Sequence, residues 1–170
     1  GYWCLPKGWG KSSTAAIYLI SCALLVPGLR AYLMSGDKDE AEILASMARG
    51  YIQRNPCLSS AFRTERYRLI VPALDSEDRV TSTDITQHGI GGEGRAYLVV
   101  IDELHVLESQ ADREVVELFL ASAGKKAWAQ ALILTNSGRP DSYAFQMMET
   151  VRAGGEGLYF WSPSPEDPRP

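Results

Sequence analysis

The sequence is poor in cysteine and histidine, the residues that form disulfides and bind zinc, with three cysteines and two histidines among 170 residues. Cys4, Cys22 and Cys57 are widely separated and odd in number, and neither the cysteines nor the histidines have the spacing of a zinc site. This pattern excludes a disulfide scaffold and a zinc module. It predicts reduced thiols in a cytosolic setting.

Long apolar runs and an excess of positive charge are also missing. The main apolar stretch, residues 15–26, is shorter than the roughly 20 residues that a helix needs to cross a bilayer, and no basic leader of the signal-peptide type accompanies it. The formal net charge is −4, from 17 lysines and arginines against 21 aspartates and glutamates. We therefore expect a protein that is neither secreted nor membrane-bound, and that meets nucleic acid only through a local patch or a separate domain.

What the chain does contain is a glycine-rich turn near its start, Leu5-Pro6-Lys7-Gly8-Trp9-Gly10-Lys11-Ser12. A Gly-Lys-Ser turn that opens a helix can surround phosphate oxygens with backbone N–H groups, while the lysine reaches the outer phosphates and the serine reaches Mg²⁺. The usual pattern has a glycine where Leu5 stands, so the match is incomplete. Lys7 is either a solvated charge or an extra cation near the γ-phosphate. The predicted nucleotide-binding residues are Lys7, Gly8, Trp9, Gly10, Lys11, Ser12 and Ser13.

A second motif lies in the segment 97–103, where an apolar strand ends in two carboxylates. Its aliphatic run is typical of a central parallel strand that is buried on both faces. Because the carboxyl ends of such strands face the ligand crevice, Asp102 and Glu103 would arrive beside the phosphates. Asp102 is predicted to hold Mg²⁺ through water and Glu103 to polarise the attacking water. His105 is either a surface histidine or a relay of the nucleotide state to a neighbouring segment.

A third polar segment, Thr135-Asn136-Ser137-Gly138, follows another apolar strand. It is either a plain turn or a sensor whose threonine and asparagine hydrogen-bond the attacking water or the γ-phosphate. Its place after the first two motifs favours the sensor. Arg139 follows directly and is a candidate arginine finger for a neighbouring subunit, as are Arg95 and Arg113.

The alternation of strand and helix patterns predicts an α/β fold with a mostly parallel central sheet flanked by helices. Together with the first two motifs, it leads us to expect the fold of a P-loop NTPase of the ASCE/RecA-like type. Residues 66–72 and 79–83 are expected to form short strands or an edge hairpin. The other strands are expected at 2–5, 30–35, 96–101, 130–135 and 157–161. The helices are expected at 11–26, from Asp37 over about 16 residues, from Glu108 or Ser109 onward, and near 141–152.

In this order, the motifs Pro-Lys-Gly-Trp-Gly-Lys-Ser, Val-Val-Ile-Asp-Glu-Leu-His and Leu-Thr-Asn-Ser-Gly resemble the ATPase domain of large terminase subunits, the DNA-packaging motors of tailed bacteriophages. Residues 35–56, which end in Arg54-Asn55-Pro56, and the segment from Asp84 to Gly89 also look terminase-like. The resemblance implies ATP and Mg²⁺ as cofactors. It places Thr135, Asn136 and Gly138 in a motif that couples hydrolysis to DNA movement. The family usually has an arginine at the position of Lys7.

The same resemblance implies the partners and the domain arrangement. It implies double-stranded DNA, copies of the chain in a ring, a small terminase subunit and a portal, in the cytoplasm of the phage host and without a membrane. Residues 1–162 would be the ATPase domain, cut short at its N-terminus, and 163–170 the start of a linker to a missing C-terminal nuclease domain. No cluster of nuclease carboxylates is visible, so nuclease activity is not expected in this segment.

Two other functions remain open beside an ATP-hydrolysing motor that drives viral DNA into a capsid. An Asp-Glu-x-His-type helicase ATPase domain shares the first two motifs, but it usually carries Ser-Ala-Thr where this chain has residues 135–137 and needs a second, similar domain. A nucleotide-binding assembly module without turnover is the other. Glu103 argues against this assembly module, because nucleotide binding alone does not need a second acid beside the metal ligand Asp102.

Overall fold

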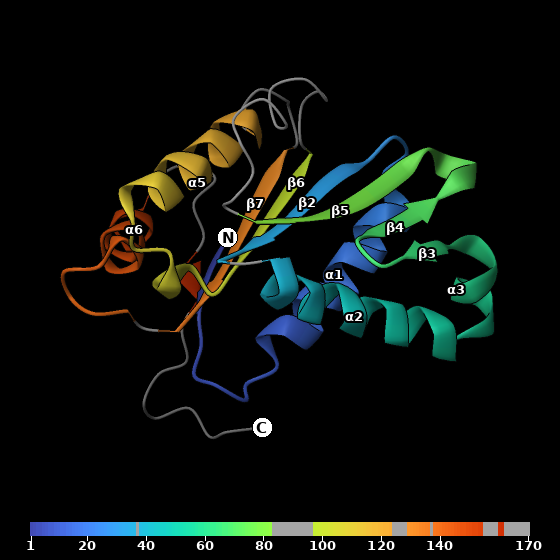
Figure 1. The fold of residues 1–170 in the computed structure, drawn as a ribbon, viewed down its shortest axis with the longest axis horizontal. Coiled ribbons are helices and arrows are strands. Elements are labelled where there is room, and N and C mark those ends of the chain that lie inside the picture. Colours follow the sequence, from blue (N-terminus) through green and yellow to red (C-terminus); the bar gives the residue numbers. More distant parts are fainter. Residues whose placement is uncertain (37, 83–96, 124–128, 137, 155–159, 162–170) are drawn as a thin grey trace.

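An eight-stranded sheet forms the centre of the fold in the computed structural model, which describes residues 1–36, 38–82, 97–123, 129–136, 138–154 and 160–161 (Figure 1). In order across the sheet, the strands are β3 (Arg63–Glu65), β4 (Arg68–Val71), β5 (Ser76–Ser82), β2 (Arg30–Ser35), β6 (Leu98–Asp102), β7 (Gln130–Thr135), β1 (Tyr2–Cys4) and β8 (Phe160–Trp161). Neighbouring strands from β5 to β8 are parallel, and only β4 pairs antiparallel, with β3 and β5. The mostly parallel sheet expected from the sequence is confirmed.

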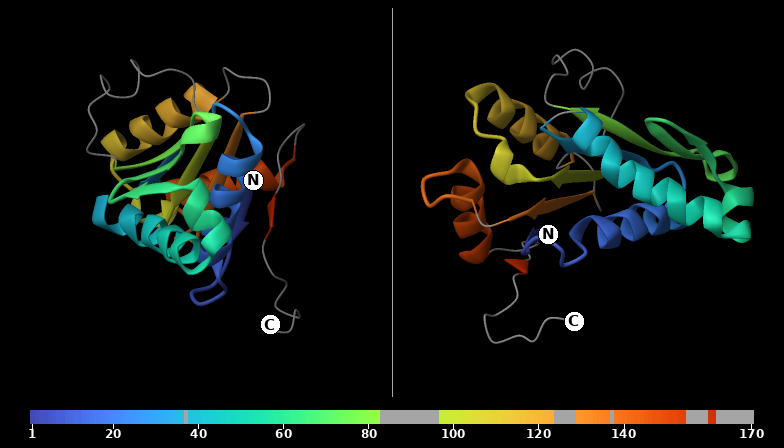
Figure 2. Two further views of the ribbon diagram at one scale, coloured as in Figure 1. Left: turned by 90° about the vertical axis from the view of Figure 1, so that its right-hand side faces the viewer. Right: turned by 60° about the horizontal axis from the view of Figure 1, so that its bottom comes forward.

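Helices cover both faces of this sheet (Figure 2). One face carries α1 (Lys11–Leu25), α2 (Lys38–Arg54) and the short α3 (Pro56–Ala61), and the other carries α5 (Gln110–Ala123) and α6 (Tyr143–Arg152). Two single 3₁₀ turns, η1 (Pro72–Leu74) and η2 (Leu104–Val106), follow β4 and β6. None of the helices in the described part of the chain combines the length and the hydrophobicity of a membrane-spanning segment.

Strand β6 is buried from end to end because it lies between the two helix layers. Leu98 and Val100 pack into the core beneath α1 and α2, while Val99 and Ile101 pack into the core beneath α5 and α6. This alternation follows from the two-residue period of a strand. Asp102 therefore lies at the carboxyl end of a strand that is packed on both faces. This end of the strand faces the turn between β1 and α1.

Most predicted elements are confirmed, and β2 and β7 have the predicted bounds. The short strands expected at 66–72 and 79–83 are β4 and β5, which pair as a hairpin would. They are not the edge of the sheet, because β5 also pairs with β2 and the outer position belongs to β3. The predicted linker at 163–170 and the segment from Asp84 to Gly89 lie outside the described residues.

Sequence reasoning missed α3 and β3, which follow α2. The side chain of Asn55 accepts hydrogen bonds from the backbone N–H groups of Cys57 and Leu58, at 3.0 and 3.4 Å, and so caps α3. Pro56 occupies the first turn, where a missing N–H removes no helical hydrogen bond. An Asn-Pro pair therefore starts a new helix here, whereas the sequence interpretation took it as the end of a segment.

One carboxyl group is buried in the core without a hydrogen-bond partner. Asp78 lies on β5 opposite Ala31 of β2 and Leu69 of β4, both of which belong to the core beneath α1 and α2. The residue is 5% exposed, and within the described part of the chain neither of its carboxyl oxygens has a partner. Burial, and then the negative charge of Glu77, raise the pKa of Asp78 well above its ordinary value.

We expect Asp78 to make the protein less stable as the pH rises. From about pH 4, the ordinary pKa of an aspartate, up to the raised pKa, the folded state keeps a proton that the unfolded state has lost, so the free energy of unfolding falls. Asp78→Asn removes this titration and keeps the shape of the side chain. The stability gain of the variant over the wild type should be larger at pH 8 than at pH 5, by about 1.4 kcal/mol for each pH unit over which the folded carboxyl keeps its proton. Urea unfolding at pH 5 and pH 8 measures this, and a difference that does not grow with pH contradicts the expectation.

Candidate nucleotide-binding site

The turn between β1 and α1 has the backbone geometry of a phosphate-binding loop. Gly8 and Gly10 have φ values of +87° and +76°, in the left-handed region that side chains disfavour. The loop is tied to β7, because the backbone N–H of Leu5 donates to the carbonyl oxygen of Thr135 at 3.0 Å. Within the described residues no side chain caps the N-terminus of α1, which begins at Lys11. The first N–H groups of this helix are therefore available to an anion.

A cleft of about 350 Å³ opens at this turn. Its lining residues come from the loop, from the start of α1, from α2 and from the end of β6, and they are Lys7, Gly8, Gly10, Lys11, Ser12, Ser13, Met47 and Glu103. All predicted nucleotide-binding residues except Trp9 thus line one cleft. Trp9 instead lines a separate pocket with Trp3, Leu5 and Thr14.

Ser12, which lines this cleft, lies close to the buried Asp102. Ser12 Oγ is 3.5 Å from Asp102 Oδ2, and Asp102 Oδ1 accepts the backbone N–H of Glu103 at 3.0 Å. Asp102 is 6% exposed, and burial, followed by the negative charge of Glu103, raises the pKa of Asp102 to about 6. Hydroxyl and carboxylate oxygens are the ligands that Mg²⁺ prefers. The pair therefore fits a magnesium ion, whose charge would favour the ionised form of this buried carboxyl.

Glu103 lies at the centre of a cluster that joins the three sequence motifs. Its Oε1 is 3.4 Å from Lys11 Nζ, and its Oε2 accepts a hydrogen bond from Asn136 Nδ2 at 3.3 Å. Lys11 Nζ also donates to Asn136 Oδ1 at 2.8 Å. The backbone of Glu103 has φ +54° and ψ +44°, a strained conformation for a residue with a side chain. Such strain is concentrated at functional sites.

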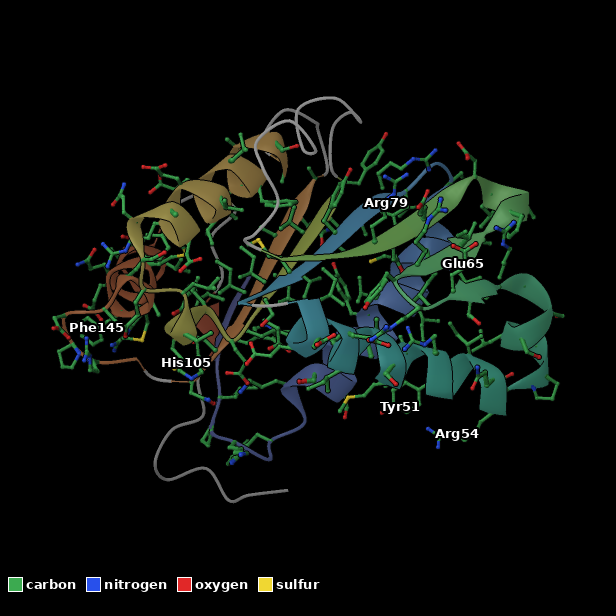
Figure 3. The ribbon with its side chains drawn as sticks, in the orientation of Figure 1. Tyr51, Arg54, Glu65, Arg79, His105 and Phe145 are labelled. Carbon is green, nitrogen blue, oxygen red and sulfur yellow. The ribbon has the colours of Figure 1, made fainter. Side chains whose placement is uncertain are left out.

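His105 belongs to the same cluster. The sequence did not decide whether His105 is a surface residue or part of the site. Its Nδ1 lies 3.1 Å from Glu103 Oε2, and its backbone N–H donates to Thr135 Oγ1 at 3.1 Å. Figure 3 shows His105 at the end of the sheet where β6 and β7 finish, apart from Arg79 and Glu65 in the other half of the molecule. The Asp-Glu-x-His spacing was the available signal. The contact itself depends on the left-handed turn at Glu103, which the sequence did not reveal.

Thr135 stands behind the cluster and does not line the cleft. It is fully buried, and its hydroxyl donates to the carbonyl oxygen of Asn136 at 2.9 Å while accepting the backbone N–H of His105. Of the two predicted sensor residues, Asn136 therefore contacts Lys11 and Glu103 directly. Thr135 instead contacts the backbone atoms of Asn136 and His105.

Arg139 does not reach the cleft of its own chain. Its side chain is 70% exposed and pairs with Glu108 at 3.4 Å and with Asp141 at 3.5 Å. The guanidinium of Arg113 stacks 5.4 Å from the centre of the Tyr143 ring, and Arg95 lies outside the described residues. The cationic side chains that line the cleft are thus Lys7 and Lys11.

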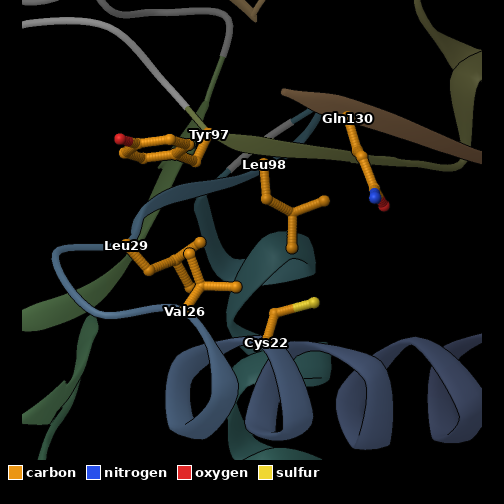
Figure 4. Close-up of a pocket in the computed structure, with 6 residues that line it drawn as sticks. All are labelled: Cys22, Val26, Leu29, Tyr97, Leu98 and Gln130. Atoms are coloured by element: carbon orange, nitrogen blue, oxygen red, sulfur yellow. The ribbon is translucent and has the colours of Figure 1, made fainter. Parts of the chain in front are cut away.

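Another pocket, of about 320 Å³, lies at the opposite end of the strands (Figure 4). Leu98 and Gln130 are the first residues of β6 and β7, and Leu29 precedes β2, so this pocket opens at the amino edge of the sheet. The other lining residues are Tyr97, before β6, and Cys22 and Val26, at the end of α1. None of the predicted site residues lines it, which leaves the cleft at the carboxyl edge as the place where the three motifs meet.

Gly138, in the third motif, is required by the close approach of α6. A Cβ atom there would lie 2.5 Å from the hydroxyl of Ser142. That hydroxyl caps α6 by accepting the backbone N–H of Phe145 at 3.2 Å, and it donates to the carbonyl oxygen of Arg139 at 2.7 Å. A side chain at position 138 would therefore displace the cap.

We expect Gly138→Ala to lower the free energy of unfolding by about 1–2 kcal/mol, the value of a helix cap. Gly50→Ala is the matched control. Gly50 lies inside α2, and a Cβ there would meet only the flexible end of the Arg54 side chain at 3.2 and 3.8 Å. This control should raise the free energy of unfolding by about 1 kcal/mol, because alanine favours a helix more than glycine does. Chemical denaturation measures both, and equal effects of the two changes would argue against a special role for Gly138.

No family model matches the chain, and no curated protein matches its sequence. Its structure is similar to solved structures of large terminases. The large terminase of bacteriophage HK97 matches with a TM-score of 0.75 and 14% identity, over 93% of this chain and 34% of that one. The large terminase ATPase domain of Thermus phage P74-26 matches with a TM-score of 0.66 and 21% identity, over 86% of this chain and 62% of that domain.

The large terminase of another thermophilic bacteriophage is also similar, with a TM-score of 0.74 and 9% identity over 94% of this chain and 39% of that one. A second structure of that terminase, in complex with ADP, matches with a TM-score of 0.61, 11% identity, and coverage of 82% and 34%. At these identities the likeness shows the fold, which is that of the ATPase domain of large terminases, as the motifs led us to expect. This chain spans about a third of the length of the HK97 protein.

Proposed function

We propose that this chain is the ATP-hydrolysing motor domain of a viral DNA-packaging terminase large subunit. The observation that supports it most is the contact of Lys11 and Glu103, which both line the cleft, with each other and with Asn136, at distances of 2.8–3.4 Å. These residues come from three motifs that are far apart in the sequence. Their chemistry of a cation, a carboxylate and an amide at a glycine-rich turn is that needed for phosphoryl transfer to water.

In this proposal the loop and the start of α1 hold the nucleotide. The backbone N–H groups beside Gly8 and Gly10 bind phosphate oxygens, and the ammonium of Lys11 neutralises charge on the outer phosphates. Ser12 and Asp102 hold Mg²⁺. A Mg²⁺ ion held there would supply positive charge that offsets the negative charge of the phosphates. Lys7, at the mouth of the cleft, adds a second positive charge where the family usually has an arginine.

Glu103 orients the attacking water and accepts its proton. A bond forms between the water oxygen and the γ-phosphorus, the bond between that phosphorus and the leaving oxygen of ADP breaks, and the proton goes to the Glu103 carboxylate. Asn136 holds that carboxylate through Nδ2. In the described structure Lys11 is engaged with Glu103 and Asn136, so phosphate binding must draw Lys11 away before the carboxylate can act.

The proposal extends to the partners that terminase resemblance implies, namely double-stranded DNA, further copies of the chain in a ring, a small subunit and a portal, in the host cytoplasm. Residues 163–170 would lead to a nuclease domain. Arg139 remains the proposed arginine finger for a neighbouring cleft, since its guanidinium is largely exposed and lies outside its own cleft. Hydrolysis by isolated domains would then be slow and would rise with protein concentration.

We expect Glu103→Gln to bind ATP with nearly wild-type affinity and to release phosphate about 10²- to 10⁴-fold more slowly, because an amide cannot accept the proton of water. Glu114→Gln is the control, as Glu114 is an exposed carboxylate on α5, away from the cleft. It should leave turnover unchanged. Phosphate release in the presence of Mg²⁺, measured over a range of protein concentrations together with nucleotide binding, tests this expectation.

A wild-type chain that binds Mg·ATP but releases no phosphate at any protein concentration would contradict the motor function. It would favour the nucleotide-binding assembly module without turnover. Equal turnover of the wild type and Glu103→Gln would instead show that another group activates water.

A further inference from the structure

The two carboxylate oxygens of Glu103 have different partners. Oε2 lies within 3.3 Å of Asn136 Nδ2 and within 3.1 Å of His105 Nδ1. Oε1 faces the phosphate loop, where Lys11 Nζ lies 3.4 Å away. One oxygen is thus held by residues of the sheet edge, and the other by a lysine that a bound nucleotide would draw away.

The hydrogen-bond network assigns a proton to Nδ1 of His105. A carboxylate only accepts hydrogen bonds, so Glu103 Oε2 cannot donate to Nδ1. The other polar atom near Nδ1 is Thr135 Oγ1 at 3.4 Å, and its single hydrogen is used on the carbonyl oxygen of Asn136 at 2.9 Å. Both neighbours of Nδ1 are therefore acceptors, and Nδ1 must be the donor.

The backbone holds His105 in place independently of its ring. The backbone N–H of His105 donates to Thr135 Oγ1 at 3.1 Å, so the segment after Glu103 is fastened to the end of β7. The ring is half-buried, which leaves little room for other orientations. A substitution of the ring therefore removes the contact with Glu103 without releasing this segment.

From these contacts we propose that His105 is a positioning residue, whose Nδ1–H holds Oε2 of Glu103 so that Oε1 is the oxygen that orients and deprotonates the attacking water. The inference rests on the proposed ATP hydrolysis and adds the residue that selects the reacting oxygen. When Lys11 moves to the phosphates, Oε1 is released on the side where the γ-phosphate would lie. Asn136 and His105 keep the carboxylate from following Lys11.

Three substitutions of His105 test this assignment. An asparagine carries its amide nitrogen where Nδ1 stood, whereas a glutamine carries it near the position of Nε2. His105→Ala is expected to lower kcat about 10- to 100-fold, the effect of a small misplacement of a reacting group, with little change in the affinity for Mg·ATP. His105→Asn should restore most of kcat, and His105→Gln should resemble alanine.

A purely structural role would lower the stability of all three variants and would not distinguish asparagine from glutamine. Wild-type kcat in His105→Ala, or equal rescue by both amides, overturns the inference while leaving ATP hydrolysis by the wild type intact. Absence of phosphate release by the wild type itself overturns the proposed function, and the inference with it.

The tautomer gives a readout that does not need turnover. The chain has two histidines, so ring ¹⁵N resonances can be assigned by comparing the wild type with His105→Asn. In the nucleotide-free protein, Nδ1 of His105 is expected to carry a proton. A neutral ring with its only proton on Nε2 overturns the inference whatever the kinetics show.

Discussion

The pairing of the buried Lys11 ammonium with Glu103 and Asn136 is the interaction on which the rest of the site depends. The side chain of Lys11 is 6% exposed, and a cation that is removed from water is costly unless charged or polar groups surround it. Glu103 supplies the charge and Asn136 supplies an oxygen at 2.8 Å. Phosphate oxygens can take over both functions, so the contact that stabilises the nucleotide-free site is also the one that a nucleotide replaces.

The parallel sheet makes this meeting possible. Because β6, β7 and β1 are neighbours and run in the same direction, their carboxyl ends lie at one edge, although Lys11, Asp102 and Asn136 are far apart in the sequence. The hydrogen bond between Leu5 N–H and Thr135 O fixes the loop to β7. Thr135 in turn fixes the segments that carry Asn136 and His105. The geometry of the cleft is thus a consequence of strand order and of buried hydrogen bonds.

Local patterns were enough to predict the elements and the motifs that form the cleft. Aliphatic runs that end in polar residues located Asp102, Glu103 and Asn136. A continuous aliphatic run indicates a strand that is buried on both faces, so the polar residues after it mark the carboxyl end of that strand. The rest depended on contacts between distant segments. The contact of Glu103 with His105 depends on a left-handed backbone at Glu103. Trp9 lines a pocket with Trp3, Leu5 and Thr14 instead of the cleft, a placement that the loop sequence does not reveal. Asp78 was equally hidden, because a carboxyl group in an apolar core contradicts the usual pattern.

The most direct test of this account is a crystal structure of the chain with Mg²⁺ and a non-hydrolysable ATP analogue. The account predicts the triphosphate in the cleft lined by residues 7, 8 and 10–13. Lys11 Nζ should lie on the outer phosphates and out of contact with Glu103, and Mg²⁺ should lie beside Ser12 and Asp102. Glu103 should remain hydrogen-bonded to Asn136. An analogue bound elsewhere, such as the pocket beside Cys22, or a Lys11 still paired with Glu103 beneath the bound phosphates, would contradict it.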